Sequence, residues 1–238
     1  MTIIPERWEQ IQRLSLKSGA HSPDSTFCVM EAAAYVAGES WTDHPESVPP
    51  TITAFLRRWN DRLPTDADRD RLLKPLIPRI VGLPNNPAIE GKRAFLAANW
   101  ALRIAIPEIL RFAKCDKEAD EIASLPEAVT DRELQRLALK VHASAIASAI
   151  ASASASAIDI AIDIASASAS AIDIAIAIAS AIDSASASAM ASAMASAIAI
   201  DSASTIASAI ASAIASASAK RLEGSQSALV ERMIECKE

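Results

Sequence analysis

The sequence has few cysteines and lacks the features of an exported protein. Three cysteines occur among 238 residues, and they lie far apart, at Cys28, Cys115 and Cys236. An odd and scattered set of cysteines argues against a disulfide scaffold and is typical of a reducing compartment. The N-terminus also lacks the basic segment and apolar stretch of a secretion signal. We therefore expect a cytoplasmic protein.

The chain also lacks concentrated positive charge and long apolar runs. Its formal net charge is -6, and no cluster of Lys and Arg stands out. Nucleic-acid-binding surfaces depend on such clusters, so we expect no nucleic-acid partner. The most apolar stretch, residues 143–219, is studded with Ser and Asp. It does not resemble a membrane span, and we expect no membrane partner.

Common motifs of catalytic and cofactor sites are missing as well. The chain contains no Cys-x-x-Cys, His-x-x-x-His, phosphate loop, dinucleotide fingerprint or Gly-x-Ser-x-Gly elbow. We therefore expect no cofactor, no metal and no catalytic residue. One alternative stays open, because Cys28 and Glu31 lie three apart on a predicted helix, with His21 and His44 in flanking loops. The simpler interpretation is a buried Cys28 and a paired or exposed Glu31.

What is present begins with a helical first half. All prolines lie at or before Pro126, so helix-breaking residues are confined to this part. Apolar residues at helical spacing predict an all-helical domain over residues 1–142. The stripes are Phe27, Met30 and Ala34; Ile52, Phe55, Leu56, Trp59 and Leu63; and Phe95, Ala98, Leu102 and Ile106. We expect Pro107 to interrupt the last of these helices.

Residues 143–219 alternate strictly between two sets of residues. Every odd position is Ala, Asp or Thr, and every even position is Ser, Ile or Met. Period two is the side-chain period of a β-strand, whereas on a helix the isoleucines would point to nearly every side. Because one strand of this length is implausible, the pattern predicts a compact β-solenoid with Ile, Met and Ser inside.

All the aspartates of this segment fall on its alanine face, which we expect to point outward because a buried unpaired carboxylate is costly. They are the predicted binding residues: Asp159, Asp163, Asp173, Asp183 and Asp201. Two alternatives stay open, a long helix, since alanine favours it, and a disordered segment. The segment has no Gly or Asn for corners, which counts against the solenoid.

The tail returns to helical spacing. Its apolar positions are Leu222, Leu229, Met233 and Ile234. They predict a C-terminal helix over residues 220–238 that caps the solenoid. The predicted fold class is therefore mixed α and β: an all-helical N-terminal domain, a β-solenoid and a capping helix.

Several segments carry a family resemblance. They are Phe27-Cys28-Val29-Met30-Glu31-Ala32, Val36-Ala37-Gly38-Glu39, Thr42-Asp43-His44-Pro45, Arg58-Trp59-Asn60-Asp61, Pro78-Arg79-Ile80-Val81-Gly82 and Ala228-Leu229-Val230-Glu231-Arg232-Met233-Ile234. The chain resembles a family of uncharacterised bacteriophage, prophage and bacterial proteins with a helical first half and a variable alanine-rich tandem repeat. The resemblance implies a bacterial host cell or a virion as the location, and no particular activity. This chain departs from the four-residue repeats of many members, since its unit is a dipeptide.

Together these features predict a non-enzymatic binding or self-assembly module that uses the regular solenoid surface. Its partner would be a protein or another copy of the chain in a homo-oligomer. A second hypothesis is ice binding, because flat arrays of small side chains at strand spacing can order water. The single Thr205 counts against it. A third hypothesis is an enzyme or metal site around Cys28, Glu31 and His44.

Overall fold

The described part of the chain is built from helices. The computed structural model describes residues 3–19, 21–22, 26–112, 116–128, 133, 136 and 217–237. Its elements are α1 (Pro5–Arg13), α2 (Val29–Ala37), α3 (Pro50–Arg62), α4 (Asp66–Leu72), η1 (Lys74–Leu76), α5 (Ile77–Ile80), α6 (Pro87–Trp100), η2 (Ala101–Ala105), α7 (Ile106–Phe112), α8 (Asp116–Ala123) and α12 (Ala217–Ile234). Among these, η1 is a 3₁₀ turn and η2 a π-helix.

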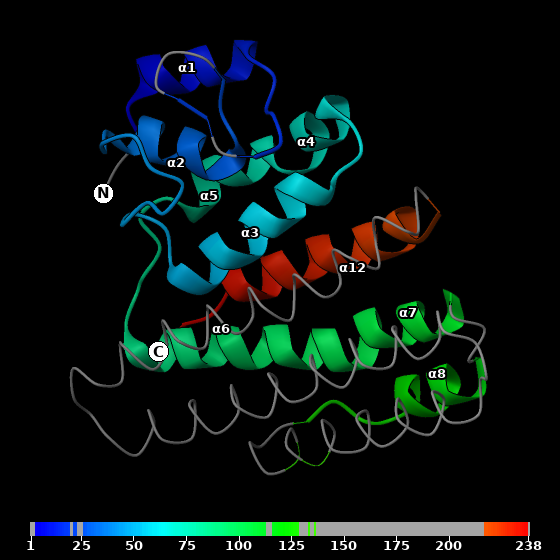
Figure 1. The fold of residues 1–238 in the computed structure, drawn as a ribbon. Coiled ribbons are helices and arrows are strands. Elements are labelled where there is room, and N and C mark those ends of the chain that lie inside the picture. Colours follow the sequence, from blue (N-terminus) through cyan, green and yellow to red (C-terminus); the bar gives the residue numbers. More distant parts are fainter. Residues whose placement is uncertain are drawn as a thin grey trace.

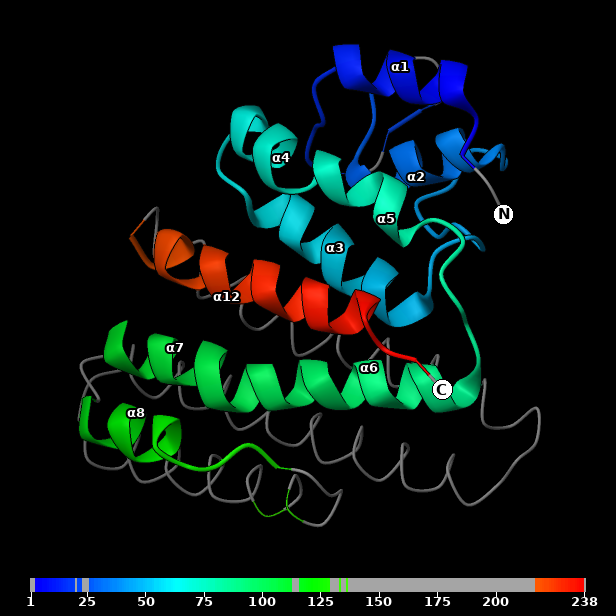
Figure 2. The ribbon, with the colours of Figure 1, turned by 180° about the vertical axis from the view of Figure 1, so that it is seen from behind.

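The helices form two groups with α12 between them. Helices α1 to α5 gather on one side, and α6, η2 and α7 form one long helical run on the other, with α8 against α7 (Figure 1). The opposite view also shows α12 lying between α3 and α6 (Figure 2). The last helix therefore packs among helices from the first half of the chain.

Local sequence explains where several helices begin and end. The Sγ atom of Cys28 accepts a hydrogen bond from the Glu31 amide, and the Glu31 carboxylate accepts one from the Cys28 amide, which together cap α2. This helix ends at Gly38, whose φ of 81° is left-handed and favours glycine. Helices α4 and α6 begin after Thr65 and Asn86, whose side chains accept hydrogen bonds from amides in the first turn.

Pro107 changes the type of helix without ending the helical run. A proline ring crowds the carbonyl group four residues earlier and offers no N–H group. The preceding residues, Ala101–Ala105, form the wider π-helix, and the chain then continues as α7. This arrangement carries Trp100 and Ile104 along the flank of α12.

The main core combines the predicted apolar stripes with residues from the C-terminal helix. The stripe of α3 is buried as predicted, at Ile52, Phe55, Leu56, Trp59 and Leu63. The same core contains Leu229, Val230 and Met233 of α12, each at most 2% exposed. Burial of apolar surface stabilises by about 25 cal/mol per Å², so α12 is a structural part of the described body.

The prediction of a mixed α and β fold is wrong. In the described ranges the regular structure is helical, with no strand beyond an isolated parallel bridge between Leu16 and Phe27. Residues 143–216 of the predicted solenoid lie outside the described residues. Its last three residues belong to α12, which begins at Ala217. There the helical preference of alanine and the buried face of the following residues outweigh the period-two pattern.

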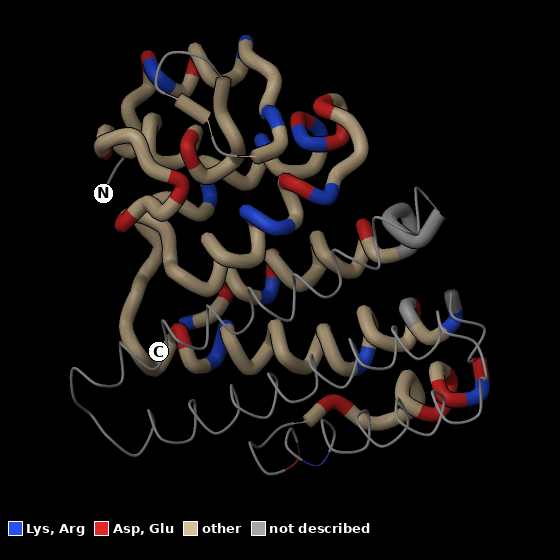
Figure 3. Tube along the Cα trace, viewed as in Figure 1, with Lys and Arg blue, Asp and Glu red and all other residues tan. Residues whose placement is uncertain are grey.

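The surface of the described part mixes charges of both signs. Lys and Arg are interspersed with Asp and Glu over its helices (Figure 3). None of the described helices combines the length and the apolar character needed to cross a membrane. Several of the charged residues lie along α12 and its neighbours, where they pair across the interface.

Candidate functional site

The candidate site lies where α12 meets the rest of the helical body. Two ion pairs run along the edge of this interface. The Arg79 guanidinium donates two hydrogen bonds of 2.5 Å to the two carboxylate oxygens of Glu231, and this holds the pKa of Glu231 below its usual range. The second pair joins Arg71 Nη1 to Glu223 Oε1 at 2.6 Å. The basic partners belong to the first half of the chain and the acidic partners to α12.

Arg93 connects α12 to three other segments from inside the protein. Its side chain is fully buried. Its Nε atom donates to the carbonyl of Met233 at 2.9 Å, and Nη1 donates to the carbonyl of Pro84 and to Glu90. The second oxygen of Glu90 accepts the amide of Thr51. The pair therefore joins the C-terminal end of α12 to the N-terminal end of α3.

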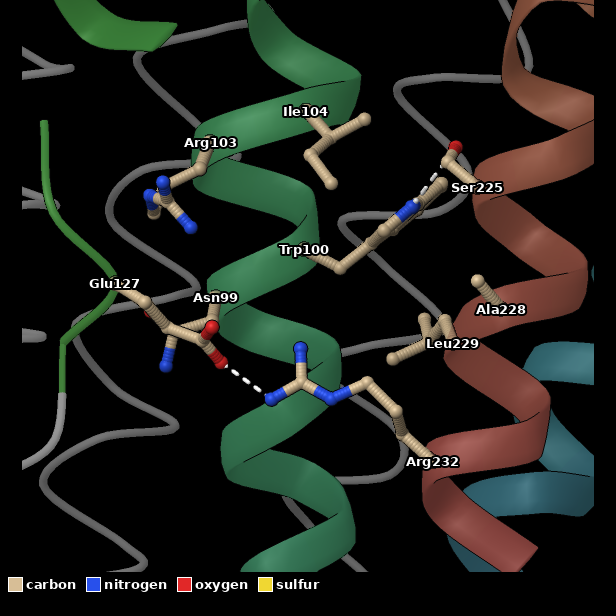
Figure 4. A pocket seen from close by; sticks show the side chains of 9 residues that line it. All are labelled: Asn99, Trp100, Arg103, Ile104, Glu127, Ser225, Ala228, Leu229 and Arg232. Atoms are coloured by element: carbon tan, nitrogen blue, oxygen red, sulfur yellow. Dashed lines mark hydrogen bonds and ion pairs between the residues drawn. The ribbon is translucent and has the colours of Figure 1, made fainter. Parts of the chain in front are cut away.

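A small pocket of about 110 Å³ opens beside α12 (Figure 4). Its described lining comes from α6, η2, the segment after α8, and α12: Asn99, Trp100, Arg103, Ile104, Glu127, Ser225, Ala228, Leu229 and Arg232. The Trp100 ring reaches toward α12, where its Nε1 atom donates to Ser225 Oγ at 3.2 Å. Across the pocket, Arg232 pairs with Glu127 at 2.6 Å.

The wall of the pocket also holds the segment that follows α8. Asn99 makes two hydrogen bonds with the backbone of Ala128, donating to its carbonyl at 3.2 Å and accepting from its amide at 2.9 Å. Nearby, Arg103 donates to the carbonyl of Leu125. A side-chain amide that satisfies both backbone groups of one buried residue holds that residue in place.

Polar groups in the lining of the pocket are bonded to other parts of the protein. Ser225 Oγ donates to the carbonyl of Leu222 and accepts from Trp100, so its hydroxyl is already engaged within the protein. Trp100, Ile104 and Leu229 offer apolar surface. The described polar groups of the pocket hold the neighbouring segments together.

His44 does not contact Cys28 or Glu31, the other residues of the predicted alternative site, in the described contacts; it pairs with other residues. His44 Nδ1 lies 2.6 Å from Asp43, and its Nε2 lies 2.8 Å from Arg57. Cys28 is 3% exposed, and burial raises the pKa of its thiol to about 12. The nucleophilic form of cysteine is the thiolate, which this burial disfavours at neutral pH.

Glu31 instead fixes the loop that precedes α2. Its buried carboxylate accepts the amides of His21 and Cys28, both at 2.7 Å, and lies 2.9 Å from His21 Nδ1. Trp41 then donates to the carbonyl of His21. Sequence reasoning placed His21 beside this helix, but only the folded chain shows that it rather than His44 meets Glu31. These contacts give the cluster a structural role.

The predicted binding residues lie outside the described residues. This holds for Asp159, Asp163, Asp173, Asp183 and Asp201, and also for Cys115. Within the described ranges, no group of three or more His, Cys, Asp and Glu residues is placed to hold a metal ion. The ice-binding hypothesis depended on the flat face of a β-solenoid, a fold that the helical described part does not indicate.

Sequence reasoning missed the residues that hold α12. Glu90 and Arg93 have the spacing of an ordinary surface pair on a helix, so nothing local marks them as buried. Asn99 and Trp100 follow each other on α6, and their partners lie far away in the sequence. The sequence signal that could have located this interface is the apolar stripe of the tail, which predicts that one face of the C-terminal helix is buried against other helices.

Comparison with known proteins adds no relative: no family model, no curated protein and no solved structure matches the chain. The family resemblance of the sequence stays a prediction.

Proposed function

We propose that the protein is a non-enzymatic interaction protein whose described helices form a frame for the alanine-rich segment. The observation that carries this proposal is the position of α12, which follows that segment in the sequence and packs in the core of the frame. Ala128, which Asn99 holds, and Ala217, where α12 begins, both belong to this frame. Both ends of residues 129–216 are therefore anchored to one body.

We assign contact with a protein partner to the aspartates of the alanine-rich segment. They are the charged residues of 143–219, and all carry the same sign. Charged groups at an interface contribute to specificity and to the rate of association more than to affinity, so the complementary partner presents a basic surface.

Site-specific photocrosslinking in bacterial cells tests this assignment. A photoreactive residue at Ala161, between two of the aspartates, is expected to give an adduct with a second protein, identified by mass spectrometry. The adduct should be lost when Asp159, Asp163, Asp173 and Asp183 are all replaced by Lys, because the charge complementarity is reversed. The same photoreactive residue at the exposed Glu6 of α1 is the matched control. Equal adducts at both positions, or adducts unaffected by the Lys replacements, would contradict the proposal.

A further inference from the structure

We draw no further inference here: the strongest candidate, the small pocket between η2 and α12 that Trp100, Arg103 and Arg232 line, carries nothing further, because its described polar groups hold neighbouring segments together and nothing in the structure shows what covers its apolar surface.

Discussion

Arg93 and Glu90 are both removed from solvent on α6, with exposed fractions of 0% and 3%. The Arg93 guanidinium donates hydrogen bonds to the Glu90 carboxylate and to the carbonyls of Pro84 and Met233. Its Nη2 atom has no hydrogen-bond partner among the described residues. An unmade hydrogen bond in a buried site costs free energy. A buried pair of this kind therefore contributes less to overall stability than to the choice of which segments meet.

Removing one member of the pair is expected to be strongly destabilising. Arg93→Met leaves the Glu90 carboxylate buried without its cation, and we expect the free energy of unfolding to fall by about 3–5 kcal/mol. The double variant Arg93→Met/Glu90→Gln keeps an oxygen acceptor for the Thr51 amide and removes the buried charge. Urea unfolding followed by circular dichroism should show this double variant to be more stable than Arg93→Met. The reverse order would show that the lone carboxylate is not what destabilises the single variant.

At the scale of elements, apolar burial and ion pairs contribute differently to the packing of α12 against the other helices. The core residues of α12 supply the bulk of the stabilisation, and the ion pairs with Arg71 and Arg79 fix its position against the neighbouring helices. The Arg79–Glu231 pair is about half exposed, with side-chain accessibilities of 46% and 40%. Solvent screening therefore limits its contribution to a few tenths of a kcal/mol.

The Arg79–Glu231 pair should give stability a measurable dependence on pH. The pKa of Glu231 in the folded chain is lowered from its ordinary value of 4.5 by the hydrogen bonds from Arg79. The contribution is therefore present above that value and is lost as the pH falls through the lower folded pKa. Urea unfolding between pH 7 and pH 3 should show a shallower loss of stability for Glu231→Gln than for wild type.

Arg79→Gln is the matched control for this measurement, because it removes the cause of the lowered pKa and leaves the carboxylate in place. It should flatten the pH dependence to a similar extent. A slope in Glu231→Gln equal to that of wild type would assign the acid sensitivity to other carboxylates, such as Asp70, whose pKa is also lowered.

Elements whose burial follows a simple period could be predicted from the sequence. The stripe from Ile52 to Leu63 is the buried face of α3 and its C-cap, and the stripe of Phe27, Met30 and Ala34 is buried at the start of and along α2. The same reasoning found a helix in the tail. It failed at Ala217–Ala219, because strict alternation was given more weight than the helical preference of alanine next to a helix with a buried face. The tertiary partners of Arg93 and Asn99 could not be found, since a side chain's distant neighbours leave no mark in local spacing.

At the scale of the whole molecule, the two ends of the chain form a single core. Residues of α2 and α3 pack with residues of α12, although residues 129–216 separate these parts in the sequence. A body of this kind cannot lose α12 without exposing apolar surface of the other helices. We therefore expect its helices to unfold together, as small single domains usually do.

Met233→Ala tests this expectation. Met233 is fully buried, and truncation of a buried methionine costs about 2–5 kcal/mol through lost burial and the cavity left behind. Circular dichroism reports all helices, whereas tryptophan fluorescence includes Trp59 in the core and Trp100 beside α12. If α12 belongs to one cooperative body, the urea midpoints from both probes should fall together. The exposed Ala228→Ser on the same helix should shift them little. Two separated transitions in Met233→Ala would instead mean that α12 detaches from a body that remains folded without it.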